Sequence, residues 1–306
     1  MFGAISQTWT MRTDRPNGPS PRRWSAALPA AAWVMIAVFG WPVVGASAPA
    51  EGLQRTIVLA VAIVVWIVGA AAVSVPSVPS LTVARVLAPA VAVGSVVGWL
   101  ASADHVNASI TSAAAIVAVG VIMSGEFGRT WVQSSAYGDE ERFPLRPPST
   151  FLVASVVVWL LATACMLIGL VAIETTARLA APALIAAVAL FALGFPRWHR
   201  LSRRWLVLVP AGVVVHDPLV LSETAMWRRH LVSGATLASS DTGAADLSGP
   251  AAGHLIELSF EEPTTVVLTD GRRNPLGTAI HLTAGLLAPS RPGAALAALR
   301  QRGIRG

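Results

Sequence analysis

Lysine is absent from the 306-residue sequence, so all 22 Lys+Arg positions are arginines, and only one cysteine and one tyrosine occur. Without lysine there is no P-loop lysine to hold a nucleotide phosphate, and a GxSxG nucleophile motif is absent as well. The single cysteine, Cys165, excludes an intrachain disulfide and a CxxC motif. The six histidines show no HExxH and no ligand spacing with cysteine. We therefore expect no catalytic residue set, no metal site and no cofactor.

Charged residues are also scarce, because they make up 12% of the chain, against about 25% in soluble domains. Hydrophobic residues make up 54%, which is typical of a membrane protein. The net charge of +6 would also suit a nucleic-acid ligand, but the arginines flank apolar runs and do not gather in one patch. We expect the lipid bilayer as partner, no nucleic acid, and, from the arginine-only and Ala/Val/Leu-rich composition, the cytoplasmic (inner) membrane of a bacterium.

Apolar runs recur along the first two thirds of the sequence, and each is close to the ~17–25 residues that a spanning helix needs. There are six of them, at about 25–44, 56–75, 81–102, 109–125, 151–173 and 179–195. Ala46-Ser47-Ala48 after the first run has the form of a signal-peptidase site, so a cleaved signal is the alternative to an uncleaved anchor. The length of the run favours the anchor.

The arginines in alternate connections predict the orientation. With a cytosolic N-terminus, twelve arginines fall inside and two, Arg55 and Arg178, fall outside. The positive-inside bias then places both termini in the cytosol. We divide the chain into a disordered cytosolic tail (1–24), a six-helix transmembrane domain (25–196) with a cytosolic loop (126–149), and a cytosolic domain (197–306).

The C-terminal domain has the pattern of short strands. The runs at 205–209 and 212–216 flank Pro210-Ala211 and predict a hairpin. Further strands are predicted at 219–221, 226–231, 255–260, 264–268 and 278–287, with a turn at Glu261-Glu262-Pro263. Ser290 is expected to cap a final helix over 292–301.

The segments Trp205-Leu206-Val207-Leu208, Gly212-Val213-Val214 and Met226-Trp227-Arg228-Arg229, with the final helix, resemble the bacterial pleckstrin-homology-like (PH-like) domain. The resemblance covers the last third of the chain. It implies a mainly-β domain ending in a helix, of a kind commonly tethered to bacterial membrane helices and without a known activity. The expected fold class is an α-helical membrane protein with a cytosolic PH-like domain.

The charged segment 137–148 lies between the fourth and fifth apolar runs. We expect it to dock the membrane part onto the C-terminal domain. The charged residues of this segment are Asp139, Glu140, Glu141, Arg142 and Arg146. We expect them to face two arginine pairs of the C-terminal domain, Arg228-Arg229 and Arg272-Arg273. A hard-cation site on the three carboxylates and an internal salt-bridged turn are the alternatives.

Other polar and small residues in the spans have simpler interpretations. Arg85 lies near the end of a span and is expected to extend to the headgroups, and Glu126 is expected to pair with Arg129. Gly94 and Gly98 form a GxxxG pattern that predicts helix packing within or between chains.

The leading functional hypothesis is a non-enzymatic scaffold or accessory protein whose PH-like domain binds a membrane protein partner or anionic lipid headgroups. The first alternative is a small transporter or lipid-handling subunit with a pathway lined by Ser95, Ser112, Ser155 and Thr163. The second is a membrane enzyme that uses Asp104, His105 or the central loop. The lack of ionisable residues near mid-membrane argues against the transporter.

Overall fold

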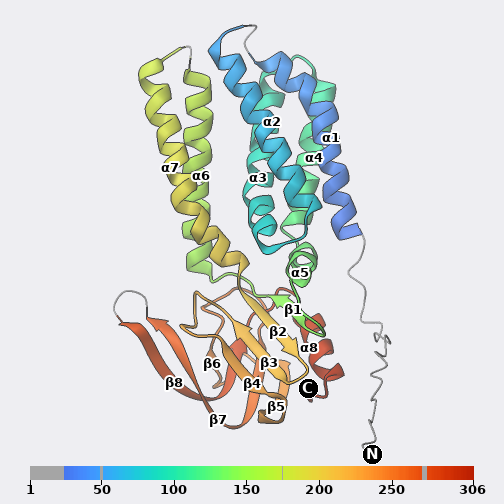
Figure 1. Cartoon of the computed structure of the whole chain (residues 1–306), viewed down its shortest axis with the longest axis vertical. Coiled ribbons are helices and arrows are strands. Elements are labelled where there is room, and N and C mark those ends of the chain that lie inside the picture. Colours follow the sequence, from blue (N-terminus) through green and yellow to red (C-terminus); the bar gives the residue numbers. More distant parts are fainter. Residues whose placement is uncertain (1–23, 49–50, 174, 271–273) are drawn as a thin grey trace, which may run out of the picture.

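The structure is a computed structural model that describes residues 24–48, 51–173, 175–270 and 274–306. A layer of long helices stands on a β-rich region (Figure 1). The helices are α1 (Trp24–Ser47), α2 (Leu53–Ser74), α3 (Val78–Ala101), α4 (His105–Ile122), α5 (Gly125–Gln133), α6 (Ser149–Ala172), α7 (Ala177–Ser202) and α8 (Pro292–Gln301). The strands are β1 (Glu141–Pro144), β2 (Trp205–Val209), β3 (Gly212–His216), β4 (Ala225–Arg228), β5 (Val232–Leu237), β6 (Ala245–Asp246), β7 (Ile256–Asp270) and β8 (Asn274–Leu287).

Six of the described helices, α1 to α4, α6 and α7, are long and apolar enough to cross a membrane. Large apolar side chains on them, such as Val64, Leu161 and Ile185, are exposed on the outside of the helical layer. Lipid would cover such side chains, while the helix satisfies its own backbone hydrogen bonds. The prediction of six apolar spans is confirmed, and it indicates a multi-pass membrane protein.

The spanning helices form a four-helix group, α1 to α4, and an α6–α7 hairpin that lies beside this group and contacts α2 and α3 (Figure 1). Close approaches occur at Gly69, where an added Cβ would lie 1.9 Å from Trp33, and at Gly169, where it would lie 2.6 Å from Leu184. At the predicted GxxxG, a Cβ on Gly98 would make one ordinary contact, 3.4 Å from Val43, and no described atom lies within 4 Å of one on Gly94. A Cβ at Gly94 would thus point into open space.

Helix α5 lies within the segment that we predicted to be a loop. Its buried Phe127 and Trp131 are four residues apart, so they share one face. The Trp131 Nε1 donates to the Ala72 carbonyl at 3.1 Å, and the hydroxyl of Ser134 donates to the Pro76 carbonyl at 2.8 Å. Helix α5 therefore lies across the ends of α2 and α3 that face the β-rich region.

The β-rich region contains two four-stranded sheets, ordered β1-β2-β3-β4 and β5-β7-β8-β6. One apolar core joins them to α8; its fully buried members include Leu206, Leu208, Val213, Val215, Ile256, Leu258, Leu287 and Leu299. The predicted hairpin of β2 and β3 and the final helix are confirmed. The C-terminal part is therefore a β-rich region of two sheets with a closing helix.

Several local predictions for this region are wrong. The expected turn at Glu261-Glu262-Pro263 is part of the continuous strand β7, where the pairing with β8 shifts between Ser259 and Thr264. A β-bulge accommodates a proline, which has no N–H for the ladder. The expected strand at 219–221 has only one bridge, from Leu221 to Leu268.

Two further boundaries differ from the prediction. The expected strand 226–231 ends at Arg228, and Arg229–Leu231 form a 3-10 turn that leads into the unpredicted β5. The described N-cap of α8 is Arg291 and not Ser290, and no side chain caps this helix end. Pro at the first turn, whose missing N–H needs no partner there, serves as the start signal.

Strand β1 connects the two halves of the molecule. It pairs antiparallel with β2, from Glu141 opposite Leu208 to Pro144 opposite Trp205. Phe143 and Leu145 are buried in the core of the β-rich region. The first strand of this sheet, β1, thus precedes α6, and the second, β2, follows α7. The predicted domain boundary at residue 197 had assigned the segment of β1 to the membrane part.

Candidate functional site

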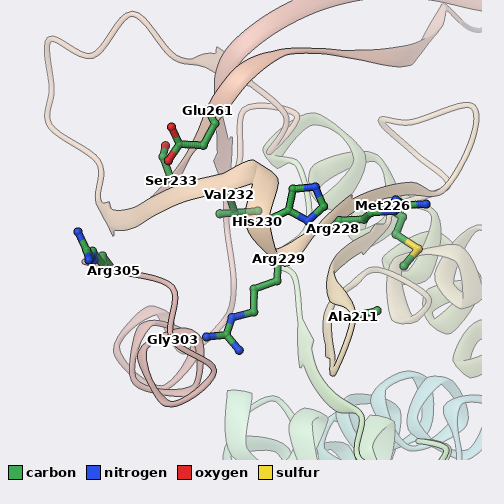
Figure 2. A pocket seen from close by; sticks show the side chains of 10 residues that line it. All are labelled: Ala211, Met226, Arg228, Arg229, His230, Val232, Ser233, Glu261, Gly303 and Arg305. Atoms are coloured by element: carbon green, nitrogen blue, oxygen red, sulfur yellow. The ribbon is translucent and has the colours of Figure 1, made fainter.

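An open groove of about 650 Å³ lies at the end of the β2–β3 hairpin that is remote from α7 (Figure 2). Basic side chains from three segments line it: Arg228 ends β4, Arg229 and His230 belong to the following 3-10 turn, and Arg305 follows α8. Glu261, on the bulge of β7, is the acidic residue among its lining residues. We call this feature the basic groove.

Two local features position these arginines. Gly303 has φ +78, a left-handed conformation that favours glycine, and a Cβ there would lie 2.1 Å from the Arg229 guanidinium. The chain therefore turns under α8 and leaves room for Arg229. The Arg305 carbonyl then accepts a hydrogen bond from the Ala235 N–H at 2.7 Å, which holds the C-terminal segment against β5.

The charge of the basic groove is not neutralised within the described chain. The side chains of Arg228, Arg229 and Arg305 make no ion pair or hydrogen bond there, and all three residues are exposed. Guanidinium groups bind carboxylates and phosphates in bidentate geometry. With one acidic residue on its wall, the groove is suited to an anionic ligand.

The two glutamates of segment 137–148 pair with arginines outside the basic groove. The Arg142 guanidinium bonds Glu140 at 2.9 Å, and this hydrogen bond holds the pKa of the Glu140 carboxyl below its usual range. Glu141 lies 3.4 Å from Arg129 and 4.0 Å from Arg302. Arg302, just after α8, also donates to the Asp139 carbonyl. None of these described contacts involves the basic groove.

The segment therefore meets the C-terminal region through β1, through Arg302, and through Arg146, whose side chain donates to the His254 carbonyl. Arg228 and Arg229 lie in the basic groove instead, and Arg272 and Arg273 lie outside the described residues. The signal for β1 in the sequence was the apolar Phe143 and Leu145, two apart, in a charged segment.

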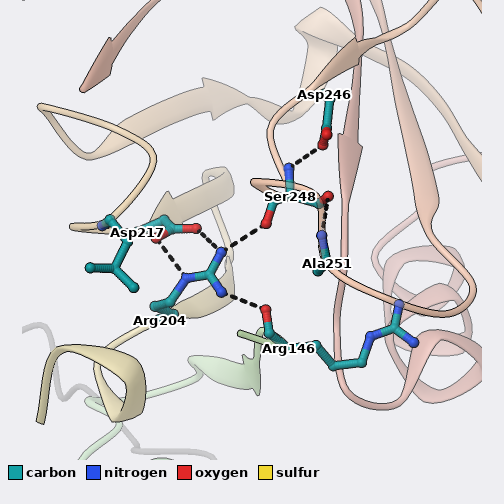
Figure 3. Close-up of polar contacts among 7 residues, drawn as sticks. Arg146, Arg204, Asp217, Asp246, Ser248 and Ala251 are labelled. Atoms are coloured by element: carbon teal, nitrogen blue, oxygen red, sulfur yellow. Dashed lines mark hydrogen bonds and ion pairs between the residues drawn. The ribbon is translucent and has the colours of Figure 1, made fainter. Parts of the chain in front are cut away.

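A second arginine cluster is structural. Arg204 and Asp217 are fully buried, and they form a bidentate pair with Nε–Oδ1 2.7 Å and Nη2–Oδ2 2.6 Å (Figure 3). The same guanidinium donates to the carbonyls of Ser248, at 3.0 Å, and Arg146. It thus ties the junction of α7 and β2 to the segment before α6. In the sequence Arg204 follows Arg200 and Arg203, and its position directly before the strand β2 is the signal that distinguishes it from them.

Arg146 and Glu126 both reach the C-terminal region. The Arg146 side chain donates to the His254 carbonyl. Glu126 of α5 pairs with Arg291 at the start of α8, so the predicted pair of Glu126 with Arg129 is wrong. Arg129 is instead held by Glu141 and lies over the Phe143 ring at 4.6 Å. Tertiary partners outcompete the pairing within the helix.

The residues proposed for transport or catalysis show mainly local roles. The Ser95 hydroxyl donates to the Ala92 carbonyl at 2.8 Å in its own helix. The Asp104 carboxylate caps α4, accepting from the Asn107 N–H at 3.1 Å, and the hydrogen bond from the Asn107 side chain lowers its pKa. His105 lies edge-on to Trp99. In the described part of the chain, no cluster of three or more His, Cys, Asp or Glu could hold a metal ion.

The hydroxyls of Ser112 and Thr163 are buried without a hydrogen-bond partner in the described chain. They lie on α4, in the four-helix group, and on α6, in the α6–α7 hairpin. The structure therefore does not bring these two residues of the suggested pathway into one helical group.

A scan against protein-family models gives no match, and searches of the curated proteins and of the solved structures give none either.

Proposed function

We propose that this chain is a non-enzymatic membrane protein that recruits a cytosolic partner protein through the basic groove. The observation that carries the proposal is the set of three exposed arginines, Arg228, Arg229 and Arg305, which converge without a partner in the described chain. A scaffold or accessory role needs such a surface and no catalytic group.

Two further parts of the proposal concern placement. The bacterial inner membrane as location is inferred from composition, and cytosolic termini are inferred from the arginine count, twelve inside against two outside. A PH-like fold for the β-rich region is supported by its two mainly antiparallel sheets and the closing helix α8.

The position of the groove favours a protein partner over lipid headgroups. Strand β2 leaves the end of α7 at Trp205 and runs away from the helices (Figure 1). At ~3.3 Å per residue, Val209 at its far end lies roughly 13 Å beyond Trp205 at its start. Screening reduces charge interactions beyond about 8–10 Å at physiological salt. An acidic segment of a soluble protein reaches the groove more readily than the headgroups of the surrounding bilayer.

A binding assay on the full chain in nanodiscs tests the proposal. The probe is a fluorescent Asp/Glu-rich peptide, and the variant is R228Q/R229Q. The control R203Q/R300Q removes the same charge from two exposed residues outside the groove. We expect binding that weakens with salt and is lost only in the groove variant, because its guanidinium groups carry the recognition.

Equal affinity of the two variants would contradict the proposal, as would binding of anionic vesicles in place of the peptide. Crosslinking and capture from native membranes, with the same pair of variants, then identifies the partner. Substrate-dependent flux through the purified protein in proteoliposomes would instead support the transporter.

A further inference from the structure

Arg85 of α3 is a charged residue at the junction of the helical layer and the β-rich region, and within the described chain its side chain has no ion-pair partner. It is partly buried, and its Nε is buried without a hydrogen-bond partner in the described chain. Burying part of a charged guanidinium is costly unless it is paired, so a group outside the protein is expected to compensate it.

The guanidinium of Arg85 lies directly against α5. A Cβ on Gly128 would be 2.7 Å from its Nη2 and 3.7 Å from the Pro144 ring at the end of β1. Helical side chains lean toward the N-terminus of their helix, which for α3 is the end that faces the β-rich region. The side chain thus points back to the layer of α5 and β1, where headgroup phosphates of that leaflet would lie.

The neighbours of Arg85 along α3 fasten the second helical group. Thr82, one turn before it, hydrogen-bonds His199 of α7 at 3.0 Å. Trp159 of α6 donates to the Val86 carbonyl at 3.0 Å. The guanidinium therefore lies near the level at which the four-helix group meets the α6–α7 hairpin.

Three acidic residues near this junction are engaged by other arginines. Glu126 pairs with Arg291, Glu141 lies 3.4 Å from Arg129, and Glu140 lies 2.9 Å from Arg142. Arg85 is left as an excess positive charge. The sequence alone predicts an arginine that extends to the headgroups, whereas the structure holds its guanidinium against Gly128 of α5.

We propose that Arg85 binds the phosphate of an anionic phospholipid from the leaflet that faces the β-rich region. Basic sites between transmembrane helices on the cytoplasmic side bind lipid headgroups, and the guanidinium fork matches a phosphate. The bound lipid would touch α3, α5 and the end of β1 together. This site lies apart from the basic groove, so the proposal does not rest on the proposed function.

Native mass spectrometry of the full chain, purified in detergent, tests the site. The probes are phosphatidylglycerol and phosphatidylcholine with the same acyl chains. The variants are R85Q and G128A, and the control is R197Q, an exposed arginine near the end of α7. Alanine is a better helix former than glycine, so G128A moves the Arg85 guanidinium without weakening α5.

We expect the wild type and R197Q to retain phosphatidylglycerol in preference to phosphatidylcholine. R85Q and G128A should bind it about 10- to 100-fold more weakly, as expected for the loss of a charge-assisted hydrogen bond. Equal retention by all four proteins would overturn the site. Displacement of the lipid signal by inorganic phosphate alone, without lipid preference, would also overturn it, because the ligand would then be a free anion.

Discussion

The buried pair of Arg204 and Asp217 allows a sharp test of how the two parts of the molecule are joined. Replacing Asp217 by alanine leaves a fully buried guanidinium without its counter-charge. The Arg204 hydrogen bonds to Ser248 and Arg146 remain, but they neutralise no charge. Removing one partner of such a pair costs about 3–5 kcal/mol, because the other charge cannot reach water.

A partly exposed pair in the same region serves as the matched control. Arg142 and Glu140 are separated by 2.9 Å, but their side chains are 17% and 25% exposed, against 0% for both members of the buried pair. Glu140→Ala should therefore cost only about 0–1 kcal/mol. The two substitutions remove the same kind of carboxylate, so the difference between them isolates the effect of burial.

Amide hydrogen exchange on the full chain in detergent measures the effect locally, at β2, β3 and the segment before α6. A loss of 3–5 kcal/mol raises the opening constant by about two to three and a half orders of magnitude, since each 1.4 kcal/mol is a factor of ten. The double variant R204M/D217L should recover much of the protection, because apolar residues of similar size often replace a buried pair without loss. Equal, small effects of Asp217→Ala and Glu140→Ala would refute this reasoning.

Three further predictions concern packing, pH and the strand β1. Gly69→Ala should destabilise the helical layer by about 1–3 kcal/mol, because the added Cβ would lie 1.9 Å from the Trp33 indole. Gly94→Ala should leave the thermal unfolding midpoint unchanged, because its Cβ would meet open space. Equal shifts of the midpoint in the two variants would contradict this packing. Burial, more than its charged neighbours, holds the pKa of His216 below its ordinary value of 6.5. The unfolded chain therefore takes up the proton first, and the stability of the folded chain should fall as the pH drops below about 6.5. The His216→Asn variant should lose this pH dependence in hydrogen exchange, and an unchanged pH dependence would exclude this histidine as its source. A soluble fragment of 204–306 lacks the burial of Phe143, worth about 1.5–3 kcal/mol, and should fold and remain soluble only when 139–148 is fused to it; equal solubility without the fusion would show that β1 is dispensable.

The long helices could be predicted because their signal is contained in each segment. A run of apolar residues near 20 indicates a span without knowledge of any partner. Helix α5 has nine residues and a single apolar face, so it fell below the length that marks a span. The turn predicted at Pro263 was also wrong, because a β-bulge accommodates this proline and keeps the strand β7 continuous.

The candidate site likewise contains residues that the sequence indicates and residues that only the fold brings together. The adjacent arginines Arg228 and Arg229 stand out in the sequence, but Arg305 joins them only because the chain after α8 bonds back to β5. Arg204 and Asp217 are 13 residues apart at the two ends of a hairpin, and their burial depends on Ser248 and Arg146 from distant segments. Charge alone could not separate a paired, buried arginine from one that is free to bind a ligand.

The connection through β1 constrains how the β-rich region can move. The chain leaves the first sheet after Pro144, crosses into α6, returns through α7 and re-enters the sheet at Trp205, which is the direct partner of Pro144 in the β1–β2 ladder. The α6–α7 hairpin is therefore attached at two adjacent points of one sheet. A single flexible linker would let the region swing, whereas two neighbouring attachments make rotation strain the ladder. The β-rich region is therefore held at both ends of the α6–α7 hairpin, which limits its rotation relative to these two helices.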